Sequence, residues 1–358
     1  MKEKNDFQWK ESIKEISPLN HIAMQASKNH WDNIGKPIEG LGLLEDMIVQ
    51  AAGIIGHENV RLDKKCILSL CADNGIVEEG VTQTDQQVTA IVAQNFAKGI
   101  ASVNMISNYS HTKVFSVDIG VACDLTQEGI IDRKIAYGTK NFLKEPAMTR
   151  QQAEQAIQIG IELVKEKKEE GYDLIGTGEM GIGNTTTTSA VASVLLGRDV
   201  EQVTGKGAGL SREGVQHKIQ VIKEGIARRK PDASDVIDVI SKVGGLDIAG
   251  MTGIFLGGGL YHVPIVIDGA ISAVAALAAK RLQKNCSYYM LASHMGKEPV
   301  CKWLMEELEC EPVIYGNLAL GEGTGAAMLF ALLDMALAVY QQNKTFEDIQ
   351  VDAYEKYQ

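Results

Sequence analysis

Short apolar runs rich in β-branched residues alternate with longer amphipathic stretches through the middle of the chain. The runs have the length of strands, and the stretches repeat their apolar residues every three to four positions, as helices do. Strands that alternate with helices form parallel sheets, because each helix carries the chain back to the edge where the next strand begins. The pattern therefore predicts an α/β fold with a parallel sheet flanked by helices.

The pattern also predicts where the elements lie. Helical patterns without strands occupy both ends of the chain, and we expect them to pair into a small helical subdomain. The resulting division is residues 1–60 for the N-terminal helical segment, 61–322 for the large α/β domain and 323–358 for the C-terminal helical segment. The predicted strands are 66–72, 114–118, 174–176, 263–267, 288–292 and 312–315, and the predicted helices are 150–169, 184–195, 211–228, 233–242 and 269–281.

Charge and apolar patterning exclude several classes of function. The net charge of −11, from 35 basic and 46 acidic side chains, argues against binding to nucleic acid or to an anionic membrane. The first residues are charged and lack the apolar core of a signal peptide. The best candidate for a membrane span, residues 250–279, is interrupted by His262 and Asp268. We expect a cytoplasmic protein with no membrane span and no nucleic-acid partner.

Cysteine and histidine spacing argues against a metal centre. The six cysteines contain no C-x-x-C pair, and no pair of histidines stands nearby at metal-ligand spacing. Asp73, Asp118 and Asp268 each end a predicted strand and could be imagined as a magnesium site. Helix capping and loop hydrogen bonds explain these aspartates better, and we expect no metal and no cofactor.

A glycine-rich segment, residues 176–188, stands between a predicted strand and a predicted helix. Glycines let backbone amides approach a ligand, and a helix start supplies N–H groups and a positive dipole end, so the segment predicts a phosphate cradle. Gly176, Gly178 and Gly181 also match the G-x-G-x-x-G pattern of dinucleotide-binding proteins. Glu179 weakens that alternative, because its carboxylate would oppose a pyrophosphate.

A second glycine-bounded carboxylate, Glu322 between Gly321 and Gly323, precedes an apolar helix. In an apolar pocket its pKa would rise toward neutrality, which suits a general base. Alone, Glu322 is explained better by capping of the helix that follows. Together with Glu179, it suggests two carboxylates in one cleft at the ends of the strands, with Asp268 on the same rim.

The motifs together resemble one family. They include Ala72-Asp73-Asn74-Gly75, Gly178-Glu179-Met180-Gly181-Ile182-Gly183-Asn184-Thr185-Thr186, Lys242-Val243-Gly244-Gly245-Leu246-Asp247 and Leu320-Gly321-Glu322-Gly323-Thr324-Gly325. In order and spacing they are similar to the nicotinate-nucleotide–dimethylbenzimidazole phosphoribosyltransferases, and the similarity covers nearly the whole chain. The resemblance implies a Rossmann-like sheet, a small helical domain built from both termini, and a homodimer.

The resemblance also implies an activity. The family transfers ribose 5-phosphate from nicotinate mononucleotide to 5,6-dimethylbenzimidazole, giving α-ribazole 5′-phosphate and nicotinate for the nucleotide loop of cobalamin. The motifs place the catalytic glutamate at Glu322. They place the phosphate loop at Gly181, Ile182, Gly183, Asn184 and Thr185, with support from Gly207 and Lys218. Glu179 is implied to touch the ribose hydroxyls or the base.

The position of Lys218 on a predicted helix would otherwise suggest a solvated surface charge. Two further functions stay open from the residues: an NAD-dependent oxidoreductase that uses residues 176–181, and a nucleotide-binding subunit without catalysis.

The segment that borders the base departs from the family pattern. Where benzimidazole-using members carry a serine and, eight positions later, a glutamine, this chain has Thr84 and Val92. Val92 cannot offer an amide partner to a ring nitrogen, so the pocket is expected to be apolar, with stacking on Met180. The alternative is that Gln86, Gln87 or Gln94 takes over the amide role.

Overall fold

The computed structural model describes residues 7–354, and its centre is a six-stranded sheet in the order β3-β2-β1-β4-β5-β6. Neighbouring strands are all parallel. This is the doubly wound order of Rossmann-like folds, which confirms the predicted fold class. The strands are β1 Lys65–Ala72, β2 Lys113–Gly120, β3 Ile131–Asp132, β4 Leu174–Met180, β5 Ile265–Ile267 and β6 Met290–Ala292.

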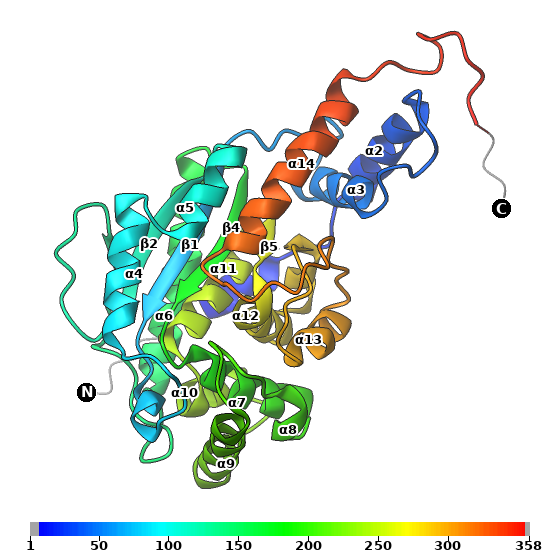
Figure 1. Ribbon diagram of the computed structural model, residues 1–358. Helices are drawn as coiled ribbons and strands as arrows, with labels where there is room; N and C mark the ends of the chain where they lie inside the picture. The colour runs from blue at the N-terminus through cyan, green and yellow to red at the C-terminus, as the bar shows by residue number, and fades with distance from the viewer. Residues whose placement is uncertain (1–6, 355–358) are drawn as a thin grey trace.

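Helices cover both faces of the sheet (Figure 1). α6 begins one residue after Thr149, which shares a reciprocal capping box with Gln152, and this explains why its start could be predicted. The helices are α1 Trp9–Ser12, α2 His21–Asn33, α3 Leu43–Ile55, α4 Gln87–Lys98, α5 Ser102–Ser107, α6 Arg150–Glu169, α7 Asn184–Leu196, α8 Val200–Val203, α9 Arg212–Arg229, α10 Val236–Val243, α11 Leu246–Tyr261, α12 Gly269–Leu282, α13 Val300–Leu308 and α14 Thr324–Gln342.

Alternate residues of β1 belong to two different hydrophobic cores, one on each face of the sheet. Leu68 and Leu70 pack with α6, α7, α10, α11 and α12. Ile67 and Cys71 pack with α3, α4 and α14 on the other face. All eight residues of β1 are buried, as expected of a central parallel strand.

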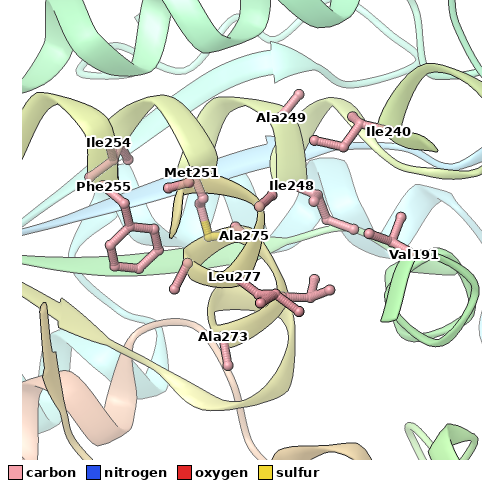
Figure 2. Packing of buried hydrophobic residues seen from close by; sticks show 14 of the residues in the cluster. Val191, Ile240, Ile248, Ala249, Met251, Ile254, Phe255, Ala273, Ala275 and Leu277 are labelled. Carbon is pink, nitrogen blue, oxygen red and sulfur yellow. The ribbon is translucent and has the colours of Figure 1, made fainter. Parts of the chain in front are cut away.

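Helix α11 runs through the larger core and was not among the helices predicted from periodicity. Fourteen of its sixteen residues are buried, so no polar face marks a helical period. Figure 2 shows Met251 and Phe255 of α11 beside Ala275 and Leu277 of α12, within one hydrophobic cluster. A helix that is apolar all round escapes a search for amphipathic patterns.

Two predictions along the sheet were wrong. The strand predicted at 312–315 is reduced to a single bridge between His294 and Ile314, and Pro312 has no N–H to extend a ladder. The strand predicted to end at Gly176 continues to Met180. Gly176 and Gly178 therefore lie within β4 and not in a loop.

Helices from the two ends of the chain lie together, as Figure 1 shows for α2, α3 and α14. The N-terminal α1 instead packs in the larger core through Trp9. The division into residues 1–60, 61–322 and 323–358 stays a prediction, and residues 1–6 and 355–358 of it lie outside the described chain.

One helix in the described part of the chain, α14, is long and apolar enough to cross a membrane. The criterion of an uninterrupted apolar run passed over it, because Asp334 interrupts the run and pairs with Lys65 at 2.7 Å. The predicted best candidate, 250–279, is instead divided among α11, β5 and α12. In α14, 56% of the apolar window is buried inside the protein, as in the core helix of a globular domain, so its length and composition are weak evidence for a span.

The contact between α6 and α11 gives a prediction for stability. A Cβ atom on Gly253 of α11 would lie 2.0 Å from the carbonyl oxygen of Ile157 in α6. Backbone atoms on both sides cannot move cheaply, so Gly253→Ala should lower the free energy of unfolding by about 3 kcal/mol in urea denaturation. Gly316→Ala is the control, because its Cβ would meet nothing closer than 3.4 Å. Equal stability of the two variants would contradict the close helix contact.

Candidate active site

The candidate site lies where β1 and β4 end side by side. The helix after β1, α4, packs on one face of the sheet, and the helix after β4, α7, packs on the other. Such a point, where successive connections leave in opposite directions, opens a crevice at the carboxyl ends of the strands. A cavity of about 340 Å³ lies in this position.

The cavity brings together most of the residues that the sequence predicted for the site. Gly183, Lys218 and Gly323 are the three that do not line its wall. Those that do are Thr84, Val92, Glu179, Met180, Gly181, Ile182, Asn184, Thr185, Gly207, Asp268, Gly321 and Glu322.

Three cavities elsewhere are larger, at about 900, 680 and 560 Å³. The first two are lined chiefly by residues of the N-terminal segment, such as Asn20 and Trp31, together with parts of the sheet's opposite end and of β6. The third lies between α7, α8 and α9. None of the three contains a residue of the two glycine loops, so we assign the chemistry to the smaller cavity.

The glycines at the start of the glycine-rich segment serve packing. A Cβ on Gly176 would lie 2.9 Å from Cβ of Ala326, and one on Gly178 would lie 2.6 Å from the carbonyl oxygen of Glu322. These glycines let the start of α14 approach β4. They are therefore not placed to cradle a pyrophosphate, which removes the basis of the dinucleotide alternative.

The part of the segment that remains a candidate phosphate cradle is shorter than predicted and begins after β4. Gly183 precedes α7 with φ of +92°, which glycine adopts at no steric cost, and no side chain caps the helix there. The 13-residue α7 therefore begins with its N–H groups uncapped by any side chain. Residues 181–185, at and before this helix start, line the main cavity or a small adjoining one of about 60 Å³. This arrangement suits an anion.

Lys218 on α9 lies behind this loop and is completely buried, contrary to the surface alternative. Its Nζ donates a hydrogen bond of 2.8 Å to Oγ1 of Thr185. A Cβ on Gly207 would lie 3.4 Å from the same nitrogen, so the lysine stands between both glycine turns. Burial lowers the pKa of Lys218 to about 8, although Glu298 nearby opposes the shift.

Glu322 lies opposite the cradle in a strained turn. Gly321, Glu322 and Gly323 have φ values of +79°, +65° and +95°. The left-handed conformation is unfavourable for a residue with a Cβ, and such strain collects at functional sites. One carboxylate oxygen, Oε2, accepts a hydrogen bond of 3.1 Å from the backbone N–H of Val103. Burial raises the pKa of Glu322, as a general base working near neutral pH requires.

Asp268, at the end of β5, holds the turn in place. Its carboxylate accepts hydrogen bonds from the backbone N–H groups of Gly323, Gly325 and Ala326 at 3.0, 2.7 and 3.2 Å. Burial nevertheless raises the pKa of Asp268 to about 7, with Glu322 contributing to the rise. This aspartate therefore caps α14 as well as lining the cavity.

The wall predicted to border the base is apolar. Val88 and Val92 line it together with Met180 and Leu320. Gln86 and Gln94 direct their side-chain amides to backbone carbonyls, of Asn74 and Ala90, and Gln87 does not line the cavity either. The alternative that a neighbouring glutamine replaces the missing amide is not supported by this arrangement.

Several lining residues were missed by the sequence analysis. His294 lies two residues after the end of β6, so the rule that strand ends form the rim would have found it. Its Nδ1 lies 2.9 Å from Oγ of Ser293, and burial lowers its pKa. Glu298 accepts a hydrogen bond of 3.1 Å from the N–H of Gly207, and no local sequence signal marks it.

Within residues 7–354, no group of three or more His, Cys, Asp or Glu side chains is arranged to hold a metal ion. All three aspartates that suggested magnesium have other partners, and those of Asp268 are the three backbone N–H groups at the start of α14. Asp118 pairs with Lys134 at 2.8 Å, and Asp73 accepts a hydrogen bond from the N–H of Ala122.

Comparison with known proteins agrees with this geometry. Residues 16–351 match the model of a family described as phosphoribosyltransferase. The nicotinate-nucleotide–dimethylbenzimidazole phosphoribosyltransferase of Ruminiclostridium cellulolyticum is 48% identical over 346 residues, which are 97% of this chain and 98% of the relative. The protein of the same name from Clostridium acetobutylicum is 47% identical over 342 residues, which are 96% and 97% of the two chains.

A solved structure shows the same fold. The crystal structure of CobT from Thermus thermophilus superposes with a TM-score of 0.88 at 33% identity, covering 93% of this chain and 100% of that one. A second structure from the same organism, of the enzyme with the full name above, gives a TM-score of 0.87 at 32% identity, covering 93% and 99%. The chain therefore belongs to the nicotinate-nucleotide–dimethylbenzimidazole phosphoribosyltransferase family.

Proposed function

We propose that this protein transfers ribose 5-phosphate from nicotinate mononucleotide to 5,6-dimethylbenzimidazole or a related aromatic base. The products are α-ribazole 5′-phosphate and nicotinate, and the α-riboside serves the nucleotide loop of cobalamin. The observation that carries the proposal is one cavity that is lined both by a helix N-terminus, with the buried Lys218 bonded to Thr185 behind it, and by the strained Glu322.

The geometry supports a division of roles. The 5′-phosphate would lie on Gly181 to Thr185, with Lys218 behind Thr185 and Gly207 beside it. Nicotinate is a cationic pyridinium in the substrate and leaves as a neutral ring, so its departure needs no acid. The attacking base approaches the opposite face of the anomeric carbon, because the product is an α-riboside.

Glu322 is the proposed catalytic base. As one ring nitrogen attacks, the N–H on the other nitrogen becomes acidic, and the carboxylate takes that proton. The same carboxylate stabilises the positive charge that develops on base and ribose. Holding both reactants in one cavity supplies further rate enhancement through proximity. The scheme uses no cofactor or metal step.

The two other functions lack support. The oxidoreductase alternative depends on Gly176 and Gly178, which lie within β4 against α14. A subunit that only binds nucleotides has no use for a glutamate held at φ +65°. We further propose that the enzyme acts in the cytoplasm as a homodimer, with the helices of both chain ends forming a small domain.

Replacement of Glu322 tests the catalytic base. Glu322→Gln keeps the size of the side chain and removes the base, so turnover should fall about 10²- to 10⁴-fold while nucleotide affinity is kept. A coupled assay of nicotinate release measures both. Glu309→Gln is the matched control, because Glu309 also has a positive φ, +58°, but lies outside the cavity. Unchanged turnover with weakened binding would assign Glu322 a positioning role.

Replacement of Lys218 tests the phosphate site. Lys218→Met fills the buried space without the charge, and the KM for nicotinate mononucleotide should rise about 10- to 100-fold, as for a lost charged hydrogen bond. The nucleoside without phosphate should bind equally well before and after the change. Lys167→Met, at a nearly buried lysine of α6, is the control for loss of a buried charge elsewhere. Equal weakening of nucleoside and nucleotide would contradict the assignment.

The apolar base wall predicts permissive selection. With Val92 in place of an amide donor, dimethylbenzimidazole should still react, but its advantage over benzimidazole, methylated analogues and phenols should be small. Equimolar bases competing for limiting nicotinate mononucleotide, with products separated by chromatography, measure this preference. Val92→Gln should increase the selectivity, whereas near-exclusive use of dimethylbenzimidazole by the unmodified enzyme would contradict the permissive pocket.

A further inference from the structure

Three side chains from three elements form a buried network beside the cavity. Asn184, the first residue of α7, directs its Nδ2 to two carboxyl groups. One hydrogen bond goes to Oε2 of Glu179 at the end of β4, and the other goes to Oδ2 of Asp247 in α11, at 3.1 Å. One amide group thus joins two carboxyl groups that are 68 residues apart in the chain (247 − 179). The proposed mechanism assigns no task to Asp247.

The surrounding backbone is shaped around Asp247, whose side chain is fully buried. A Cβ on Gly245 would lie 2.3 Å from Oδ1 of Asp247, and one on Gly181 would lie 3.1 Å from Oδ2. The carboxylate therefore occupies space that two glycines leave open. Oδ1 also accepts a hydrogen bond of 2.9 Å from the N–H of Ile248.

The network contains acidic side chains, and no basic side chain among the described residues acts on Glu179 to neutralise them. The charged and titratable groups that face Glu179 are Asp247 on α11, Asp268 after β5, Glu322 before α14 and Cys71 on β1. All four are acids, so burial and repulsion favour the neutral form of one carboxyl group. Burial, with Asp247 next in importance, raises the pKa of Glu179 to about 8, whereas burial raises that of Asp247 only to about 6.

The position of the proton follows from the contacts. Asp247 lies in the first turn of α11, where the helix dipole favours a negative charge. The proton of the pair therefore belongs to Glu179. Oε2 of Glu179 already accepts from Asn184, which leaves Oε1 to carry it. Oε1 faces the cavity wall at Gly321, where an added Cβ would lie 2.7 Å away.

We propose that Asp247 is a positioning residue whose negative charge holds the carboxyl group of Glu179 neutral, while Asn184, which donates to both carboxyl groups, keeps that group turned toward the cavity as a hydrogen-bond donor to the substrate. This inference rests on the proposed function, because it assigns a role to one wall of the same site. The substrate, nicotinate mononucleotide, carries a phosphate and a carboxylate. A neutral Glu179 donates its O–H to a ribose or carboxylate oxygen, whereas an ionised Glu179 would repel an anionic ligand.

The first measurement locates the proton without turnover. The infrared band of a protonated carboxyl group, taken at pH 7 as the difference between unmodified enzyme and Glu179→Gln, should be present. In Asp247→Asn the repelling charge is gone, and the band should disappear at a pH about one unit lower than in the unmodified enzyme. Asp118→Asn, another buried aspartate at a strand end, is the control and should leave the band unchanged.

The second measurement is a double-mutant cycle on kcat/KM against pH. Glu179→Gln removes the titratable carboxyl group and keeps a side-chain hydrogen-bond donor, so its pH profile is the reference for the cycle. In Asp247→Asn, kcat/KM should fall on the alkaline side about one pH unit earlier, because Glu179 ionises earlier. In the Glu179→Gln background, Asp247→Asn should have no such effect. Lys218 also titrates near pH 8. The effect of its deprotonation on kcat/KM can be distinguished from that of Glu179, because it is the same with and without the Glu179→Gln substitution.

Two results would overturn the inference. One is absence of the carboxyl band at pH 7, and the other is an Asp247→Asn shift of equal size with and without Glu179. Failure of the proposed function is a different result, because the unmodified enzyme would then release no nicotinate when given nicotinate mononucleotide and a base.

Discussion

The carboxylate of Asp268 joins the sheet to the turn that carries Glu322, residues 321–323, and the shape of the site depends on that contact. Three backbone N–H groups at the start of α14 donate hydrogen bonds to this one side chain, which directly follows β5. Without it, the first turn of α14 would face a buried surface with unpaired donors. The contact fixes where the helix begins, and thereby holds Glu322 in a left-handed conformation that an unsupported chain would leave.

Close approach of backbones supplies the second half of this arrangement. Gly178 allows the carbonyl of Glu322 to lie against β4, and Gly323 lies against Ile67 of β1, where an added Cβ would come within 2.6 Å. Side chains at these positions would push the turn away from the sheet and widen the cavity. The glycines of the motif thus serve two tasks: those before Met180 set the distance between sheet and turn, and those after it open the helix start to an anion.

The parts of this structure that could be predicted are those in which a local sequence pattern is compatible with only one secondary structure. The capping box at Thr149 marks α6, and the 66–72 run, apolar except for Ser69, marks the central strand. Helix α11 could not be found, because complete burial removes its period. Local patterns do not reveal contacts between residues that are distant in the sequence. They therefore missed the packing of Gly176 against Ala326 and the hydrogen bond from the N–H of Gly207 to Glu298. The burial of Lys218 was equally invisible, and its proposed role came from family resemblance.

The formal charge of the chain is a poor guide to the charge that a substrate meets. A protein with a net charge of −11 would be expected to repel an anionic nucleotide. In the cavity, however, burial raises the pKa of Glu179 to about 8 and that of Asp268 to about 7, so the site carries fewer negative charges near neutral pH than its side chains suggest. The helix start of α7 and the buried Lys218 then act over short distances in a poorly screened environment, where they outweigh distant surface acids. In the proposed site, recognition of the phosphate therefore depends on local desolvation and not on the overall charge.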